Sequence, residues 1–477
     1  MSGFVGRQNE LTTLDTRLRR VAESAAGSAV AIRGRRQVGK SRLVQEFCDR
    51  ARLPYVYFMA TKGAAPTESL AAFLLELRES SLVTDPALVP ELAGSWADAF
   101  RILAGVLPSS PSVVVIDELP WLAEQDTSFD GVLQTAWDRL LSRRPVLLLL
   151  LGSDLHMMER LTAYDRPFFG RADNLTLGPL DPAEIAAATG LDAADALDAH
   201  LITGGLPGIL RSWPHGTAPL DFLEQESADP AAPLFSVPES ALLAEFPSPD
   251  QTRRVLEAVG GGDRTHANIA ATAGGRAGAI ASGSLSPILR RLTDDKRVLA
   301  IDEPLSTRPG KPALYRVADS NLRLYLAVLR SAQELSRRGR YQSAFRLIQR
   351  RWSAWRGRAI EPLIRESLEL AAFAGTLPWP EVEAVGGWWN RRFDPEIDLV
   401  GADRGPIARN VYFAGSVKWL DTPFDDHDMA ALRKSISQMP DYEPGKTGLV
   451  IASRSGTARC DSDLVWGPDD ILSAWSS

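Results

Sequence analysis

The stretch that decides the fold is Gly34-Arg35-Arg36-Gln37-Val38-Gly39-Lys40-Ser41, which matches the pattern GxxxxGK[ST] in full. It follows the apolar run Ala29–Arg33 and precedes the amphipathic segment Ser41–Arg50. A phosphate-binding loop requires this context, because it connects a buried strand to the start of a helix. The stretch therefore predicts a nucleoside triphosphate site in a P-loop NTPase fold.

The chemistry of such a loop assigns a role to each part of the stretch. Glycines let main-chain N–H groups approach the phosphate oxygens, and the N-terminus of the next helix adds partial positive charge. We expect every residue from Gly34 to Ser41 to contact the nucleotide. Lys40 should reach the β- and γ-phosphates, and the hydroxyl of Ser41 should ligate Mg²⁺.

Two carboxylates end a second apolar run. Asp117 and Glu118 directly follow Val113–Ile116. Asp117 would hold Mg²⁺ through its water shell, and Glu118 would polarise the attacking water as a general base. The alternative is that the pair forms the N-cap of a helix. The phosphate-binding loop upstream favours the catalytic interpretation.

Two further polar positions have open interpretations. Ser153 follows the run Val146–Leu151 and would sense the γ-phosphate, unless Ser153 or Asp154 caps a helix that starts near Leu155. Arg171, in the triplet Phe169-Gly170-Arg171, would stabilise charge in the transition state or would form a surface salt bridge. The pattern does not decide between these alternatives.

The N-terminal part alternates apolar runs with helical patterns, which indicates βαβ units and a doubly wound parallel sheet. The expected strands are Ala29–Arg33, Tyr55–Met59, Val113–Ile116 and Val146–Leu151. Helical, alanine-rich sequence follows to about Glu245, and Pro247-Ser248-Pro249 indicates a linker. We expect an α/β core in residues 1–178 and a helical lid in residues 179–246.

Three short helices and two strands indicate a winged helix in residues 250–320. They are expected at Arg253–Val259, Ala267–Ala273, Ser284–Thr293, Val298–Ile301 and Leu314–Val317. Cations near the end of the third helix and around the wing are Arg290, Arg291, Lys296, Arg297, Arg308 and Lys311. The module either enters a major groove of DNA through its third helix or has a structural or regulatory role.

A basic stripe lies within a last block of mixed character, residues 335–477. Eight arginines and no acidic residues occur between positions 337 and 358; the arginines are at 337, 338, 340, 346, 350, 351, 356 and 358. Aromatic residues alternate with them at 341, 345, 352 and 355. The stripe either binds nucleic-acid phosphates or is a solvated helix whose aromatic face belongs to the core.

Composition excludes several classes of protein. The 477 residues are 45% hydrophobic and 24% charged, with a formal net charge of −7, which is typical of a globular protein. Cys48 and Cys460 cannot form a disulfide framework, which indicates a reducing compartment. The longest aliphatic run, Val146–Leu151, is too short to span a bilayer, and the first ten residues lack a signal-peptide core. We therefore expect a cytoplasmic protein without a membrane role.

These motifs together resemble the prokaryotic AAA+-like ATPases often called the archaeal ATPase family. The resemblance covers about residues 3 to 245 and begins with the segment Phe4–Glu10, which resembles the family's F-x-G-R-x-x-E start. It implies ATP as the nucleotide, with Val5 and Gly6 near the base. The segment Gly204-Gly205-Leu206-Pro207 is similar to the family's lid element, in which Pro207 would pack near the adenine. Gly152-Ser153 and Gly170-Arg171 match further family elements.

The same family often continues with a winged helix and a domain similar to PD-(D/E)xK nucleases. This resemblance implies that Glu361, Asp398 and Lys418 form an α/β nuclease-like site that binds Mg²⁺. The chain departs from the pattern at Ser416, where the family has an acid. A serine hydroxyl is a poor ligand beside a carboxylate. The domain is therefore expected to be an inactive nuclease fold that binds nucleic acid or protein, or to have a rearranged site.

Three functions remain as hypotheses. The first is an ATP-hydrolysing regulatory ATPase that binds DNA through its C-terminal half. The second is an ATP-gated, Mg²⁺-dependent nuclease. The third is a nucleotide-switched scaffold that binds a protein and has no DNA role. The sequence leaves the protein partner and self-association as a homo-oligomer open.

Overall fold

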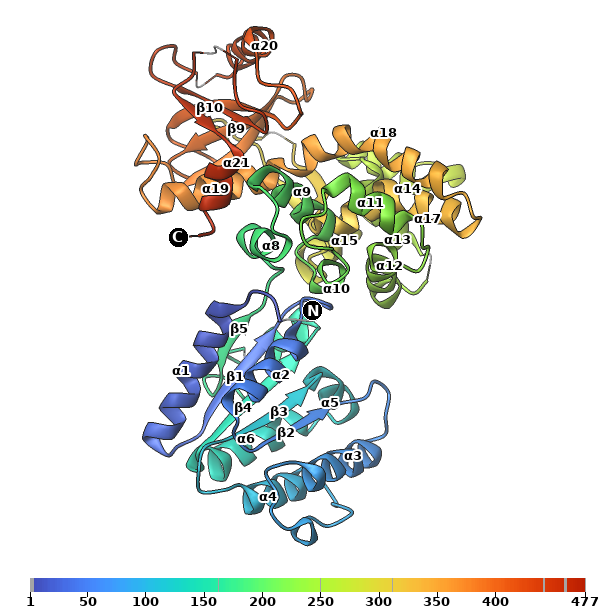
Figure 1. Ribbon diagram of the computed structural model, residues 1–477, viewed down its shortest axis with the longest axis vertical. Coiled ribbons are helices and arrows are strands. Elements are labelled where there is room, and N and C mark those ends of the chain that lie inside the picture. The colour runs from blue at the N-terminus through green and yellow to red at the C-terminus, as the bar shows by residue number, and fades with distance from the viewer. Residues whose placement is uncertain are drawn as a thin grey trace. The chain divides into compact units, whose positions relative to one another are not determined.

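Five parallel strands in the order β2-β3-β4-β1-β5 form the sheet that carries the loop, as the computed structural model shows (Figure 1). Their bounds are Ser28–Arg33 for β1, Tyr55–Met59 for β2, Ser112–Asp117 for β3, Val146–Gly152 for β4 and Asp173–Thr176 for β5. The first four strands match the predicted runs to within one residue at each end. The predicted doubly wound α/β fold is confirmed.

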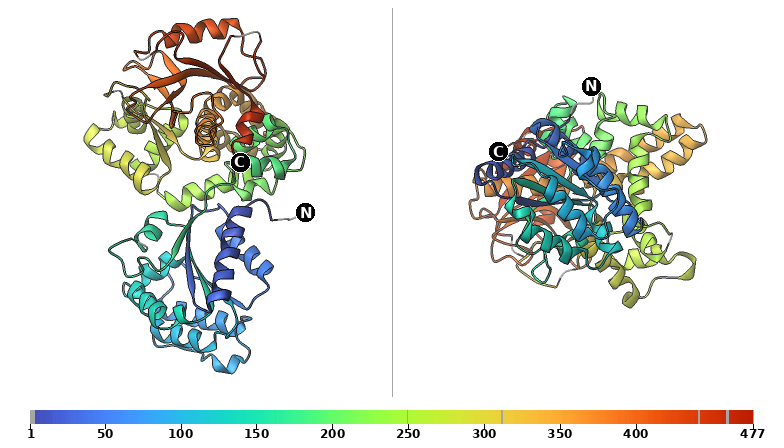
Figure 2. Two further views of the ribbon diagram at one scale, coloured as in Figure 1. Left: turned by 90° about the vertical axis from the view of Figure 1, so that its left-hand side faces the viewer. Right: turned by 90° about the horizontal axis from the view of Figure 1, so that it is seen from below.

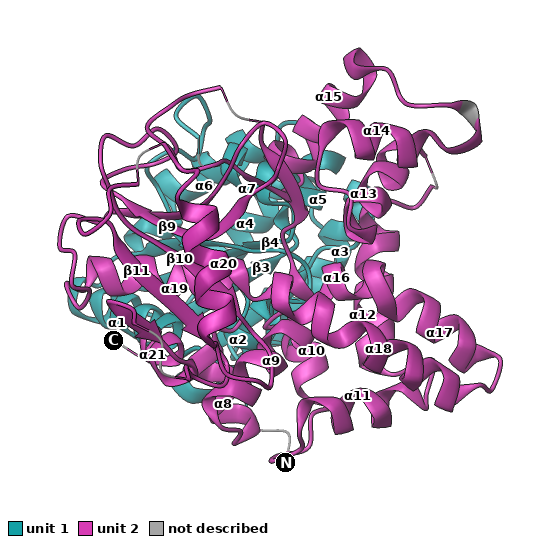
Figure 3. Ribbon diagram, turned by 90° about the horizontal axis from the view of Figure 1, so that it is seen from above, with its two compact units in different colours: residues 1–179 teal, residues 180–477 magenta. Residues whose placement is uncertain are grey.

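The structure describes residues 4–161, 163–248, 250–310, 312–440, 442–458 and 461–476. Three residues named above, Pro249, Lys311 and Cys460, lie outside these ranges. The chain divides into two compact units, Met1–Pro179 and Leu180–Ser477 (Figure 3). The predicted winged-helix and nuclease-like segments, and the predicted lid from residue 180 onward, belong to the second unit.

Helices cover both faces of the first sheet (Figure 2). Their bounds are Gln8–Ser24 for α1, Lys40–Ala51 for α2, Pro66–Glu79 for α3, Trp96–Val106 for α4, Leu119–Gln125 for α5, Phe129–Arg139 for α6 and Leu155–Leu161 for α7. Helices α3, α4 and α6 pack on one face through an aromatic cluster in which Phe73, Trp96 and Phe129 contact each other or shared neighbours. Helices α1 and α2 cover the other face (Figure 1).

Every residue of β3 and β4 is buried. A strand that is buried on both faces needs apolar side chains at consecutive positions, which is why these strands appear in the sequence as continuous runs. Loops at the carboxyl ends of such strands carry the ligand site in open α/β sheets. Since β4 lies between β1 and β3, the residues that follow these three strands meet at one edge of the sheet.

The second unit begins with helical sequence. The bounds are Pro182–Thr189 for α8, Ala193–Thr203 for α9, Pro207–Leu210 for α10, Pro219–Ser227 for α11, Pro233–Glu245 for α12, Gln251–Gly261 for α13, His266–Gly274 for α14 and Ser282–Arg290 for α15. Antiparallel strands β6, Leu299–Asp302, and β7, Leu314–Val317, follow. Three more helices are α16, Ser320–Leu324, α17, Arg330–Arg337, and α18, Tyr341–Ala359.

A mixed sheet in the order β12-β11-β10-β9-β8 forms the C-terminal part. The strands are Ala384–Trp389, Glu396–Ala402, Val411–Lys418, Gly448–Ser453 and Leu464–Trp466 for β8 to β12, and the helices are Glu361–Phe373 for α19, Asp426–Ile436 for α20 and Pro468–Ser473 for α21. Helices α19 and α21 pack on one face and α20 packs on the other. Leu197 and Leu201 of α9 belong to the core beneath α19.

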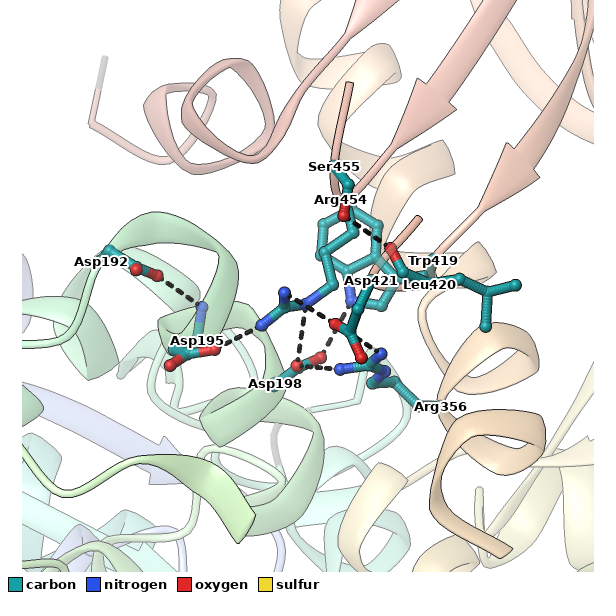
Figure 4. Close-up of polar contacts among 9 residues, drawn as sticks. All are labelled: Asp192, Asp195, Asp198, Arg356, Trp419, Leu420, Asp421, Arg454 and Ser455. Atoms are coloured by element: carbon teal, nitrogen blue, oxygen red, sulfur yellow. Dashed lines mark hydrogen bonds and ion pairs between the residues drawn. The ribbon is translucent and has the colours of Figure 1, made fainter. Parts of the chain in front are cut away.

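A buried ion network also joins α9 to this C-terminal sheet (Figure 4). Asp198, on α9, is 1% exposed and accepts hydrogen bonds from Nη1 of Arg356 at 2.8 Å and from Nε1 of Trp419 at 2.9 Å. Arg454 donates to the same carboxylate at 3.2 Å and to Asp421 at 3.0 Å. Helix α9 is therefore an integral part of the second unit.

Candidate nucleotide-binding site

The loop between β1 and α2 has the geometry of a phosphate-binding loop. Nζ of Lys40 donates to the main-chain carbonyls of Gly34 at 2.7 Å and Arg35 at 3.1 Å, so the ammonium group lies inside the curve of the loop. Burial lowers the pKa of Lys40, and the carboxylates of Glu118 and Asp117 oppose that shift. The carboxylates of Glu118 and Asp117 therefore lie near the ammonium group of Lys40.

Glycine is required at the first position of the loop. A Cβ atom on Gly34 would lie 2.4 Å from the carbonyl oxygen of Leu177, which leaves no space for a side chain. Gly39 has φ 95°, in the left-handed region that glycine adopts at little cost, and Gln37 has φ 68°. The two glycines of the motif thus allow the close turn from the sheet into α2.

The segment before α1 is fastened to the loop by Arg7, a residue that the site prediction left out. One guanidinium nitrogen of Arg7 donates to the carbonyls of Val38, at 3.0 Å, and Gly178, at 2.6 Å. Val5 and Gly6 immediately precede this buried arginine, and Gly6 has φ 66°. The F-x-G-R-x-x-E motif could have identified this site residue. Its arginine is Arg7, which the turn buries against the phosphate-binding loop.

Asp117, at the end of β3, is buried and accepts two hydroxyl donors on one oxygen. Oγ of Ser41 lies 2.6 Å and the hydroxyl of Tyr57 lies 2.5 Å from Oδ2. The other oxygen, Oδ1, accepts the main-chain N–H of Glu118 at 2.8 Å. The structure thus brings together the two residues predicted to hold Mg²⁺, Ser41 and Asp117. The sequence analysis did not identify Tyr57.

Glu118 occupies the N-cap position of α5, but its side chain makes no capping hydrogen bond. The carboxylate instead accepts Oγ of Ser153 at 2.8 Å to both oxygens. Helix α7 is capped by Asp154, whose Oδ1 accepts the N–H of Met157 at 3.0 Å. Ser153 is therefore free of the capping role and links the end of β4 to Glu118.

Arg171 does not join these residues. Its guanidinium forms a bidentate pair with Asp138 at 2.8 Å for both bonds, and its third nitrogen donates to the carbonyls of Pro167 and Phe169. Bidentate arginine–carboxylate pairs hold both side chains in one geometry. The structure favours the salt-bridge alternative for this arginine.

Pro207 begins α10 in the second unit.

Arg365 connects two of the nuclease-like residues, because it contacts the carboxylate of Glu361 and donates to the main-chain carbonyl of Asp398 at 2.9 Å. Nζ of Lys418 pairs with Asp428 of α20 at 2.5 Å, whereas Asp398 accepts Oγ of Ser416 at 2.9 Å. Glu361 pairs with Arg365, at 3.3 Å. Across the described residues, no group of three or more His, Cys, Asp or Glu side chains is arranged to hold a metal ion.

The basic stripe is not one continuous surface. Arg356 is buried against Asp198, and Arg337 forms an ion pair with Glu239 at 2.9 Å. The other six arginines are exposed. Trp352 is buried and stacks on Trp355, with ring centroids 5.6 Å apart. The aromatic side chains therefore mainly serve the core, while most of the arginines face solvent.

The comparisons with known proteins identify two regions. Residues 3–150 match the family model described as "AAA ATPase domain", and residues 325–430 match the model described as "Archaea bacterial proteins of unknown function". No curated protein matches the chain.

Several solved structures are similar to the chain. A Walker-type ATPase of Pyrococcus abyssi is 17% identical with a TM-score of 0.47, covering 68% of this chain and 96% of that chain. The ORC2 protein of Aeropyrum pernix, in ADPNP-ADP complexes, is 14% identical with a TM-score of 0.44, covering 72% and 98%. The ORC1 protein of the same organism, in complex with DNA, is 15% identical with a TM-score of 0.33, covering 70% and 93%.

The sheet order and the loop with its facing carboxylates define the first unit as a P-loop NTPase. More particularly, residues 3–150 are an AAA ATPase domain, and the chain is an ATPase of the AAA type that also carries the C-terminal region found in archaeal and bacterial proteins of unknown function. Within the described residues, no helix combines the length and apolar character needed to cross a membrane.

Proposed function

We propose that this ATPase is a regulatory switch that binds and hydrolyses Mg²⁺–ATP at the loop of the first unit and acts on DNA through residues 180–477. The observation that carries the proposal is the hydrogen-bonded chain at the ends of three adjacent strands. Ser41 contacts Asp117, and Ser153 contacts Glu118, with Lys40 beside them. These are the groups that phosphoryl transfer to water requires.

The oxygen donors fit a magnesium ion. Ser41 and Asp117 offer a hydroxyl and a carboxylate next to the loop, and Mg²⁺ prefers such hard oxygen ligands while keeping several waters. When bound, the ion would neutralise charge on the phosphate oxygens. Lys40 would add positive charge at the β- and γ-phosphates, and Glu118 would accept a proton from the attacking water. Ser153 would hold that carboxylate in place.

For the DNA role, we interpret residues 250–320 as a winged helix. Helices α13, α14 and α15 precede the β6–β7 hairpin, in the order expected of that module. Arg290 and Arg291 are exposed at the end of α15. A nuclease-like fold in residues 335–477 would then serve binding rather than cleavage. The amino group of Lys418 pairs with Asp428, and Ser416 stands where the family has an acid, so we propose no nuclease activity.

ATP turnover tests the catalytic part. Lys40→Ala should lose nucleotide binding, and Glu118→Gln should bind ATP but turn it over at least about a hundredfold more slowly, as expected for loss of a general base. Glu124→Gln, the same change on the exposed side of α5, is the matched control. Unchanged turnover in both site variants would refute the proposal.

DNA binding tests the second part. A labelled duplex is titrated with the full chain, with and without ATP, across a salt series. Affinity that depends on both ATP and salt supports the switch. If the duplex does not bind even at low salt, the DNA role is wrong and a protein-binding scaffold becomes the better interpretation.

A further inference from the structure

Helix α18 presents a solvent face that carries cations and no anions. Its exposed arginines are Arg346, Arg350, Arg351 and Arg358, and Arg338 and Arg340 precede the helix. The hydrogen bonds of Arg346, Arg350 and Arg351 go to main-chain carbonyls. In the described part of the chain, none of the four helical arginines forms an ion pair with a carboxylate. Their charges are not neutralised within the fold.

Two of these cations lie where they are unfavourable for the helix itself. The N-terminus of α18 has no side-chain cap and no acidic residue in its first turn, while Arg338 and Arg340 lie there. Positive side chains near a helix N-terminus oppose the helix dipole. Stability of the helix therefore does not explain Arg338 and Arg340, whereas Arg358 in the last turn is favourable for the helix dipole.

The chemistry of the face points to a polyanion rather than to another protein. The residues between the arginines are small or uncharged, and none of the exposed large apolar side chains lies between Gln342 and Arg358. The core of a protein interface is normally apolar. By contrast, a nucleic-acid backbone is bound mainly by arginine and lysine contacts to phosphate.

We propose that α18 binds the sugar-phosphate backbone of DNA and supplies much of the affinity, while the winged-helix segment orients the duplex. This inference rests on the DNA role proposed above. Arg346 and Arg350 lie one turn apart, about 6 Å along the axis, and the helix is about 28 Å long. A helix of this length can follow several successive phosphates.

The test compares two variants of equal charge. One replaces Arg346, Arg350, Arg351 and Arg358 with Gln, and the control replaces the exposed arginines of the C-terminal sheet, Arg391, Arg392, Arg404 and Arg409, with Gln. Binding of a labelled duplex is measured against salt concentration. The α18 variant should bind at least about tenfold more weakly at low salt, and its log–log salt slope should fall by about 0.9 for each phosphate that the helix no longer neutralises. The control variant should keep most of the affinity at low salt and most of the salt slope.

The outcomes separate the two proposals. If the wild type binds DNA and the α18 variant keeps its affinity and slope, the helix is not the binding surface, although the DNA role stands. If both variants lose affinity equally, only net charge matters and the assignment to α18 is wrong. If the wild type binds no DNA, the proposed DNA role fails together with this inference. An unchanged unfolding transition of the second unit, followed by circular dichroism, shows that each variant is folded.

An independent observation concerns Tyr57 in the first unit. In the parallel pairing of β2 with β3, Met59 lies opposite Asp117, so the side chains of Tyr57 and Asp117 point to the same face of the sheet. The hydroxyl of Tyr57 reaches the oxygen of Asp117 that also accepts Ser41.

The geometry points to Tyr57 as a positioning residue for magnesium, provided that the loop binds Mg²⁺–ATP as proposed. Two donors on Oδ2 fix the rotation of the Asp117 carboxylate. A fixed carboxylate can orient the water shell of the ion. Tyr57 itself touches neither the ion nor the nucleotide in this assignment.

Nucleotide binding with and without Mg²⁺ tests this role in the full-length chain. Tyr57→Phe should bind a fluorescent ADP about tenfold more weakly in Mg²⁺ and equally well in EDTA, since it loses a hydrogen bond to a charged group. Tyr55→Phe, on the same strand and the same face, is the control, because its hydroxyl makes no hydrogen bond among the described residues. Equal losses in both conditions, or no loss in Mg²⁺, would overturn the assignment.

Discussion

At the scale of single residues, the hydroxyl of Ser153 is the group that orients the expected general base. Ser153→Ala should lower kcat by about tenfold, because a hydrogen bond to a charged group contributes roughly 1.5–3 kcal/mol. Nucleotide affinity should hardly change, since Ser153 contacts Glu118 rather than the loop. Steady-state turnover and equilibrium nucleotide binding together check this result. A loss confined to affinity would contradict it.

Glu361 gives a prediction about pH. Burial raises the pKa of Glu361 from its ordinary value of 4.5 to about 7, with Asp398 adding to the shift and Arg365 opposing it. The folded chain therefore binds a proton that the unfolded chain releases, and this contribution to stability is present below pH 4.5 and lost as pH rises through 7. The loss is on the order of 3 kcal/mol.

Glu361→Gln removes this titration, because glutamine resembles the protonated glutamate. Relative to the wild type, the variant should become more stable as pH rises from 5 to 8, by roughly 2–3 kcal/mol. Denaturant unfolding at both pH values measures the difference. A constant difference between the two proteins would show that Glu361 does not titrate in this range.

Where a motif fixes the spacing of residues, the sequence is enough to predict that they lie together. Lys40, Ser41, Asp117 and Glu118 meet because the loop and the strand ends share one edge of the sheet. Tyr57 could not be found in the same way, since its contact depends on the register between β2 and β3, which no motif encodes.

Arg356 was predicted to lie on the surface stripe, and this was wrong. It follows Ala344, Ile348 and Trp352 at intervals of four residues, all of them buried. Residues at this spacing share one face of a helix. The run of arginines suggests a surface position for Arg356, but the helical spacing of four residues places it on the core side.

At the scale of elements, the sequence missed β5. Its four residues, Asp173–Thr176, are mainly exposed and polar, and the strand lies at the edge of the sheet beside β1. A strand with one neighbour needs no apolar run, so hydrophobic periodicity gives no signal there. Strands β1, β3 and β4 were found because burial on both faces leaves a continuous apolar pattern, whereas the other edge strand, β2, was found because its side chains are apolar or aromatic throughout.

Asp198 gives a prediction about how the elements are joined. Asp198→Ala should destabilise the second unit by about 3–5 kcal/mol, because Arg356 would stay buried with only the exposed Asp421 as an ion-pair partner. Asp192→Ala, which removes the N-cap of the same helix, should cost only about 1 kcal/mol. Thermal or denaturant unfolding of the two variants compares their losses of stability. Similar small losses would mean that the network adds little to stability.

At the scale of the whole molecule, the boundaries of folding units can be tested. A fragment of residues 180–477 should fold and unfold in one transition, because α9 belongs to the same core as the C-terminal sheet. A fragment of residues 325–477 lacks Leu197, Leu201 and Asp198 and should lose cooperative unfolding. Circular dichroism melting curves of both fragments make the comparison. A sharp transition in the shorter fragment would refute this boundary.

The buried ion network that joins α9 to the C-terminal sheet has a consequence for how such chains evolve. Recombination that exchanged only the last third of the gene would place a foreign arginine opposite a resident α9. The exchange would be tolerated where α9 keeps an acid at the position of Asp198, since Arg356 and Trp419 both donate to it. Related chains should therefore inherit these three positions together. Covariation among the three positions would show which segments were exchanged as a single piece.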